Sequence, residues 1–305
     1  MKKANYYTPV VTAFDETEKP DISGNRKIWD HLIRGGVSGL VIMGSIGEFF
    51  ALDFEEKRRM ICDVTDYAKG RTRLLIGTGG MNTEETVFLS NYALSKGADA
   101  ALVVSPYYFS LSERDILNYY DTVCGKIEGK VYLYNFPART GYDISPKVTL
   151  ELLRRHGNIA GYKDTVGEMG HTRALIQTVS REFPDFEVLS GFDEFMLHNM
   201  LSGGSGCIGG LSNIYPELAS AWVRAVDERN LDACEKIQGI FDQLMEIYSV
   251  ADIFVPVIKE GVRNRGVDIN TRCRNPLTSL TEKQKIHLAN IMKACESRMR
   301  ESHIL

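Results

Sequence analysis

Lys163 is the residue of this sequence with the clearest capacity for chemistry. It ends a short apolar segment, Ile159–Lys163, and is followed by Asp164. If that segment is a strand that ends inside a barrel, the lysine loses solvation, and desolvation favours the free amine over the ammonium ion. A free amine attacks a ketone and forms an imine, which then serves as an electron sink. From its position alone, Lys163 could equally extend to the rim or pair with Asp164.

Other polar residues also follow apolar segments. Tyr134 lies in the segment Val131–Asn135, and its phenol could move protons to and from the oxygen atoms of an intermediate. Ser45 lies in a glycine-bracketed turn, where backbone N–H groups can bind a carboxylate. Tyr108 ends a further such stretch, Ser105–Tyr108. Taken singly, these residues could be an ordinary core tyrosine or turn serine. Their shared position at the ends of predicted strands favours a common functional site.

The elements that would position these residues are short apolar segments, which alternate with longer amphipathic ones. Runs that are apolar along most of their length are typical of parallel strands covered on both faces. The pattern predicts strands at Thr8–Phe14, Gly39–Gly44, Leu74–Gly77, Ala101–Ser105, Val131–Asn135, Ile159–Lys163, Phe186–Ser190 and Gly206–Gly209.

Amphipathic helices are expected between these strands. Asn82 has the character of an N-cap before the helical stretch Val87–Lys96, and Pro146 suits a first helical position. The other predicted helices are Asp53–Lys69, Ser112–Ile127, Ser145–His156, His171–Phe183 and Pro216–Glu228. The helix at Asp53–Lys69 is expected to direct Phe54, Met60, Ile61, Val64 and Ala68 to one face.

Eight strand-then-helix units without a break in composition predict an α/β fold, a (β/α)8 TIM barrel over residues 1–230. Residues 231–305 show helical patterns without strands, so we expect three helices that form an extension packed on the barrel as part of one unit. An open, doubly wound sheet would give a similar pattern, but no G-x-G-x-x-G follows the first strand. In a barrel, catalytic groups lie at the carboxyl ends of the strands.

Composition narrows the function classes. The net charge is -4 and there is no long run of lysine and arginine, so neither a nucleic acid nor an anionic membrane is expected as a partner. Six scattered cysteines form no C-x-x-C pair and are expected to be reduced thiols. Without an apparent signal peptide, a membrane-length apolar run or an H-E-x-x-H spacing, we expect a cytoplasmic protein with no bound metal.

Four motifs, taken in order, resemble those of the dihydrodipicolinate synthase/N-acetylneuraminate lyase family of pyruvate-dependent class I aldolases. The resemblance runs from about Tyr7 through the final helices. The segments Gly44–Glu48, Pro106–Tyr108, Tyr134–Pro137 and Gly161–Asp164 are similar to the family's G-S/T-S/T-G-E, P-Y-Y, Y-N-x-P and G-x-K-D/E, respectively.

The resemblance implies a role for each matching residue. Lys163 would form a covalent Schiff base with pyruvate, so that no other cofactor is needed. Tyr134 would be the proton shuttle and Ser45 would relay protons. Tyr108 would reach into the site of a neighbouring subunit and complete the relay. Since members of the family are commonly tetramers built as dimers of dimers, a homotetramer is expected.

The resemblance also implies how substrate is bound. Backbone amides of Ser45 and Ile46 would hold the pyruvate carboxylate, and the carbonyl region of Ile208 would line the pocket. Ile46 departs from the family pattern, which often has a second hydroxyl residue there. Arg139 stands where the synthases bind the carboxylate of aspartate semialdehyde, although it could equally hold a group of a sugar acid or be an arginine in a surface turn.

The substrates implied are a small 2-keto acid and an aldehyde. Ile46 and the segment Phe254–Glu260 look more like the branch that cleaves sugar acids, so we expect release of pyruvate from a 2-keto-3-deoxy sugar acid of the gluconate or galactonate type. Dihydrodipicolinate synthase is the second candidate activity, and N-acetylneuraminate lyase is the third. A catalytically silent regulator that binds keto acids is the alternative from another class.

Overall fold

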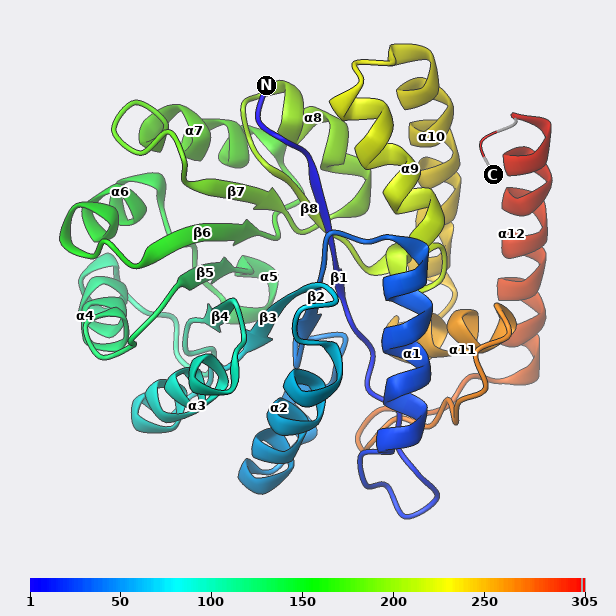
Figure 1. Cartoon of the computed structure of the whole chain (residues 1–305), viewed down its shortest axis with the longest axis horizontal. Helices are drawn as coiled ribbons and strands as arrows, with labels where there is room; N and C mark the ends of the chain where they lie inside the picture. The colour runs from blue at the N-terminus through cyan, green and yellow to red at the C-terminus, as the bar shows by residue number, and fades with distance from the viewer. Residues whose placement is uncertain (303, 305) are drawn as a thin grey trace.

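The computed structural model describes residues 1–302 and 304, and its centre is a closed barrel of eight parallel strands (Figure 1). The strands follow one another around the barrel in chain order, and the last pairs with the first. The prediction of a (β/α)8 barrel is confirmed, and the alternative of an open, doubly wound sheet is wrong. The strands are β1 (Asn5–Pro9), β2 (Gly39–Ile42), β3 (Arg73–Gly77), β4 (Ala100–Val104), β5 (Val131–Asn135), β6 (Ile159–Asp164), β7 (Glu187–Ser190) and β8 (Gly206–Ile208). His303 and Leu305, in the predicted extension, lie outside the described residues.

Helices cover the outside of this barrel. Asn82 caps α3 as predicted, because its side chain accepts hydrogen bonds from the backbone N–H groups of Glu84 and Glu85. Pro146 is the first residue of α6, also as predicted. The helices around the barrel are α1 (Ile22–Gly35), α2 (Phe54–Ala68), α3 (Thr83–Lys96), α4 (Glu113–Cys124), α5 (Pro137–Thr140), α6 (Pro146–Arg155), α7 (Met169–Val179), α8 (Met196–Leu201) and α9 (Pro216–Asp227).

The first strand begins and ends earlier than the sequence predicts. Strand β1 must face β8, and this register pairs Asn5–Tyr7 with Gly206–Ile208. The Val10 N–H still donates to the Val41 carbonyl, but beyond Val10 the buried chain leaves the ladder, because side chains take over as acceptors. The Val11 N–H donates to Asn213 Oδ1 at 3.2 Å, and the Ala13 N–H donates to Asn25 Oδ1 at 3.0 Å. In the sequence, an apolar run looks the same whether it forms a strand or a buried segment outside the sheet.

Two features of the first helices were not expected. Helix α1 is absent from the predicted helices, because Gly24 and Gly35 weaken its helical pattern, although it buries Ile28, Trp29 and Leu32. In α2 the predicted apolar face is buried except for Phe54, which is 37% exposed. Phe54 lies in the first turn and packs against Phe88 of α3, with ring centroids 5.4 Å apart.

Side chains fill the inside of the barrel. A buried cluster there includes residues from seven strands, namely Tyr7, Val41, Leu75, Leu102, Tyr132, Leu189 and Ile208. At the end where the strands begin, Arg73 donates to the hydroxyls of Tyr7 and Tyr132. This polar cluster lies at the rim opposite to the carboxyl ends of the strands, where a barrel places its active site.

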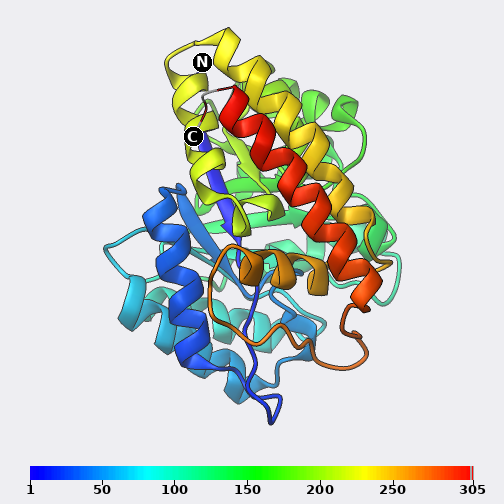
Figure 2. The same cartoon turned by 90° about the vertical axis from the view of Figure 1, so that its right-hand side faces the viewer.

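The C-terminal part contains the predicted three helices, α10 (Leu231–Leu244), α11 (Val255–Asn264) and α12 (Glu282–Glu301), with a 3-10 helix, Met245–Ser249, between the first two. Helices α10 and α12 lie side by side along one flank of the barrel (Figures 1 and 2). Phe241 of α10 stacks on Trp222 of α9 at 4.5 Å and on Tyr6 of β1 at 5.8 Å, so one core joins the extension to the barrel. No helix among the described residues is long and apolar enough to cross a membrane.

Candidate active site

Lys163 and Tyr134 face each other at the carboxyl ends of β6 and β5. The two residues are partners in the strand register, so their side chains point to the same face of the sheet. Lys163 is only 5% exposed, and its Nζ lies 4.3 Å from the centre of the Tyr134 ring. The Tyr134 hydroxyl lies 3.4 Å from Ser45 Oγ, which follows β2. A buried amine and a buried phenol therefore form one group with a partly buried hydroxyl.

These three residues line a cavity of about 180 Å³. Its walls come from the ends of several strands and from the segment that leads into α11. The lining residues are Pro9, Ser45, Ile46, Tyr134, Phe136, Lys163, Thr165, Gly191, Phe192, Ile208, Gly210, Met245, Tyr248 and Phe254. The cavity is small and mostly apolar, with a few polar groups that converge on it, as expected for a small-molecule site.

The structure brings most of the predicted site residues together. Ser45, Ile46 and Ile208 line the same cavity as Lys163 and Tyr134. Arg139, on α5, lines an adjoining cavity instead, with its guanidinium 5.5 Å from the centre of the Phe136 ring. Tyr108 lies outside both cavities in the loop after β4, where it is 78% exposed.

The loop that carries Ser45 is anchored by a buried ion pair. Glu48 has a left-handed backbone, with φ 56°, and its side chain is fully buried. Its carboxylate lies 2.5 Å from Lys259 Nζ of α11 and accepts the Arg274 N–H at 2.9 Å. Lys259 also donates to the Arg272 carbonyl at 2.8 Å. The glutamate at the end of the Gly44–Glu48 motif thus connects this loop to the C-terminal extension.

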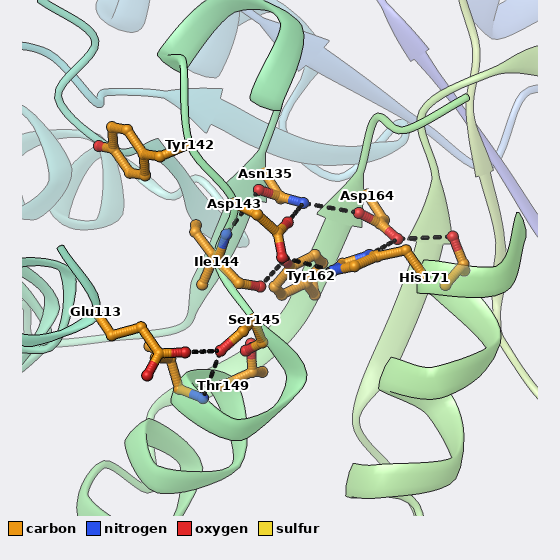
Figure 3. A network of polar contacts seen from close by, with 12 residues as sticks. Glu113, Asn135, Tyr142, Asp143, Ile144, Ser145, Thr149, Tyr162, Asp164 and His171 are labelled. Carbon is orange, nitrogen blue, oxygen red and sulfur yellow. Dashed lines mark hydrogen bonds and ion pairs between the residues drawn. The ribbon is translucent and has the colours of Figure 1, made fainter. Parts of the chain in front are cut away.

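A second network lies behind the strand ends that carry Tyr134 and Lys163 (Figure 3). Asn135 donates to Asp164 at 3.0 Å and to Asp143 at 2.7 Å. His171 bridges the same two carboxylates, with Nδ1 2.9 Å from Asp164 and Nε2 3.0 Å from Asp143. The network ties β5, β6, α7 and the loop after α5 together. It accounts for the asparagine and aspartate that accompany the tyrosine and lysine in the two motifs.

His171 is the cation of this network. Burial alone would lower the pKa of His171, but the hydrogen bonds to Asp143 and Asp164 outweigh it and raise the pKa to about 10. The imidazole is therefore protonated at neutral pH, and both of its nitrogens donate. Thr172 adds a hydrogen bond to Asp164 at 2.6 Å, so the buried carboxylate has three donors.

A third polar group reaches the cavity from the C-terminal part. Tyr248, in the 3-10 helix Met245–Ser249, lines the cavity and donates its hydroxyl to Asp193 Oδ2 at 2.7 Å. Asp193 also accepts from the Tyr6 hydroxyl and from the Leu211 N–H. Burial raises the pKa of Asp193, although these hydrogen bonds oppose the rise. Because its proton is directed to Asp193, the Tyr248 oxygen is suited to accept a hydrogen bond from a substrate hydroxyl.

Sequence reasoning did not identify His171, Asp143, Tyr248, Asp193 or Lys259 as parts of the site. Only Asp193 carried a usable signal, because it follows the end of β7 by three residues and the strand-end rule could have been extended to it. The others come from helices and loops whose position depends on tertiary packing.

A model of the dihydrodipicolinate synthetase family matches residues 2–295. YagE of Escherichia coli, provisionally named a 2-dehydro-3-deoxy-D-gluconate aldolase, is 34% identical over 285 residues, covering 93% of this chain and 94% of YagE. YjhH of the same organism, provisionally named a 2-dehydro-3-deoxy-D-pentonate aldolase, is 34% identical over 291 residues, covering 94% of this chain and 97% of YjhH.

Solved structures agree with these matches. The crystal structure of YagE in complex with pyruvate has a TM-score of 0.94 at 33% identity, covering 96% of this chain and 98% of YagE. Dihydrodipicolinate synthase from Aquifex aeolicus has a TM-score of 0.90 at 27% identity, again covering 96% of this chain and 98% of that chain. Both similarities extend over the barrel and the helical extension together.

Proposed function

This chain belongs to the dihydrodipicolinate synthetase family, whose members are carbon–carbon lyases, and we propose that it cleaves a 2-keto-3-deoxy sugar acid into pyruvate and an aldehyde through a Schiff base on Lys163. One observation carries the chemistry. The Lys163 amine is buried at the end of β6, 4.3 Å from the centre of the Tyr134 ring, with Ser45 beside the Tyr134 hydroxyl.

The cleavage would proceed in steps that these residues can support. The Lys163 amine condenses with the substrate ketone and releases water. Tyr134 removes the proton from the C4 hydroxyl, the C3–C4 bond breaks, and its electron pair moves into the protonated imine to give an enamine. The aldehyde departs, C3 takes up a proton, and water hydrolyses the imine to free pyruvate. Ser45 and Tyr108 would relay protons between Tyr134 and solvent.

Binding of the keto acid would rest on the loop after β2. Backbone amides of Ser45 and Ile46 are proposed to hold the carboxylate in the pocket that the carbonyl region of Ile208 also lines. The imine supplies the electron sink, so the proposal needs no metal and no further cofactor. Enzyme dialysed against EDTA is expected to keep its activity.

The substrate class rests on the relatives and on the polar groups of the cavity. YagE and YjhH are provisionally named aldolases of 2-dehydro-3-deoxy sugar acids. The Tyr248 oxygen, with its proton directed to Asp193, is suited to accept a hydrogen bond from a sugar hydroxyl. Arg139 in the adjoining cavity favours the second candidate, dihydrodipicolinate synthase, because a guanidinium binds a carboxylate well.

We further propose a cytoplasmic homotetramer arranged as a dimer of dimers. The loop after β4 supports this assembly, since Tyr108 is 78% exposed and Phe109 is 70% exposed. Exposed aromatic side chains of this kind are typical of a surface that a second copy covers.

The test follows pyruvate release across 2-keto-3-deoxy sugar acids and N-acetylneuraminate, coupled to NADH oxidation, with Lys163→Ala as the inactive variant and Lys126→Ala as its surface control. Release that disappears only in Lys163→Ala supports the lyase. If no sugar acid is cleaved and pyruvate condenses with aspartate semialdehyde, the protein is a dihydrodipicolinate synthase and the proposed lyase activity is wrong. If pyruvate forms a borohydride-stable adduct but nothing turns over, the chain is a keto-acid-binding regulator.

A further inference from the structure

A second cavity of about 280 Å³ adjoins the one that contains Lys163. Ser45, Phe136 and Phe254 line both cavities, so the second cavity begins beside the group formed by Lys163, Tyr134 and Ser45. We call this second cavity the distal chamber. Atoms of a substrate that extend beyond the reacting carbons can therefore enter it.

The walls of the distal chamber are mostly hydrocarbon. Eight of its twelve lining residues have side chains without a polar atom, namely Phe49, Phe50, Val104, Phe136, Ile253, Phe254, Val255 and Leu277. The polar exceptions are Ser45, Tyr107, Thr140 and the exposed Arg139. The Thr140 hydroxyl is already bonded to the carbonyls of Phe136 and Tyr142.

This composition suits an apolar substituent better than a polyol chain. A sugar hydroxyl placed against the apolar walls would find a partner only where it reached Ser45, Tyr107 or Arg139, and an unpaired buried hydroxyl is unfavourable. A phenyl ring would instead replace water at apolar surface, which is favourable. Size agrees, since a cavity of about 150 Å³ lined by leucine, isoleucine and phenylalanine binds benzene.

We propose that the enzyme also accepts aromatic aldehydes of about the size of benzaldehyde, with the ring in the distal chamber and the carbonyl carbon beside the pyruvate enamine. The inference rests on the proposed Schiff base at Lys163 but not on a sugar acid as the substrate. The enamine C3 of pyruvate bonds to the aldehyde carbon, and the aldehyde oxygen takes a proton through Tyr134. Water then hydrolyses the imine and releases 4-hydroxy-2-oxo-4-phenylbutanoate. Atoms and electrons balance without an oxidant or a reductant.

The experiment incubates the full-length enzyme with pyruvate and either benzaldehyde or D-glyceraldehyde, and quantifies both aldol products by chromatography. In parallel, borohydride reduction with pyruvate reports the Lys163 adduct by mass. Leu277→Trp fills the distal chamber from its loop, and Ile253→Trp fills it from a residue that is 43% exposed. Leu231→Trp, at an exposed leucine outside both cavities, is the matched control.

We expect a benzaldehyde product, and we expect either filling variant to lower the benzaldehyde-to-glyceraldehyde rate ratio by about tenfold or more while Leu231→Trp leaves it near the wild-type value. An enzyme that forms the adduct and uses glyceraldehyde but not benzaldehyde overturns this inference alone. A ratio unchanged in folded filling variants also overturns it. Absence of the pyruvate adduct overturns both this inference and the proposed function.

Discussion

The hydroxyl of Tyr134 is the residue-level feature that most directly links the structure to proton transfer. It lies 3.4 Å from Ser45 Oγ, and Lys163 Nζ lies 4.3 Å from the centre of the Tyr134 ring, so Tyr134 stands between the amine and the loop after β2. Positioned general acids and bases contribute about 10²- to 10⁴-fold to a rate.

Tyr134→Phe is therefore expected to lower kcat for pyruvate release by about 10²- to 10⁴-fold, because the variant keeps the ring but loses the proton carrier. Borohydride trapping of pyruvate on Lys163 should slow but persist. Tyr119→Phe, which removes another buried hydroxyl outside the site, is the matched control. Equal kcat values for the two variants would remove Tyr134 from the mechanism.

Ion pairs and hydrogen bonds between elements decide how the site is held. The pair of Glu48 and Lys259 connects the loop after β2 to α11, and both side chains are fully buried. Removing one partner of such a pair leaves an uncompensated charge, which typically costs about 3–5 kcal/mol.

Lys259→Met is expected to lower the free energy of unfolding by about 3–5 kcal/mol, measured by urea titration. Lys285→Met breaks an exposed pair with Glu282 and should cost about 1 kcal/mol or less. The double variant Glu48→Gln/Lys259→Met should recover part of the loss, because no unpaired charge remains. If Lys259→Met lowers the free energy of unfolding no more than Lys285→Met does, the structural role of the Glu48–Lys259 pair is contradicted.

The network around His171 makes a specific prediction about pH. The pKa of His171 is raised from 6.5 to about 10, so the folded state binds the imidazole proton more tightly than the unfolded state does. The stabilisation is fully present below about pH 6.5 and is lost as the pH rises through about 10. Urea titrations between pH 7 and 10.5 should show stability falling with pH, and His171→Gln should lack this component of the slope. Parallel slopes in the two proteins would show that His171 is not protonated in the folded state.

Exposed aromatic and apolar side chains gather near one part of the whole molecule, on α2, α3 and the loops after β2, β3 and β4. Contacts connect several of them, including Phe54 with Phe88 and Tyr108 with Phe109. The exposed members are Phe50, Phe54, Met81, Phe88, Tyr107, Tyr108 and Phe109. Such a concentration is unusual for a monomer and is typical of an interface.

Tyr108→Glu is expected to reduce the molar mass measured by sedimentation, because a carboxylate at a buried interface is costly to desolvate. If Tyr108 completes the relay of a neighbouring subunit, kcat should fall as well. Ile286→Glu, at an exposed residue of α12, should change neither property. An unchanged mass in Tyr108→Glu would show that the interface lies elsewhere.

The barrel and the centre of the site could be predicted from the sequence because both depend on local signals. Apolar runs that alternate with amphipathic stretches identify the strands, and the carboxyl ends of parallel strands meet at one rim. Lys163, Tyr134 and Ser45 were therefore expected together, and the structure places them around one cavity. The same local signal failed where packing decides the outcome, as in β1, which ends at Pro9 although the apolar run continues to Phe14.

The tertiary structure alone decided which distant residues support that centre. Tyr248 meets Asp193 across 55 positions of the chain, and Lys259 meets Glu48 across 211 (259 − 48). His171 reaches Asp143 only because the first turn of α7 lies beside the loop after α5 (Figure 3). The distal chamber combines side chains from the loops after β2, β4 and β5 with others from the C-terminal part. Contacts of this kind depend on how complete elements pack, and no short stretch of sequence encodes them.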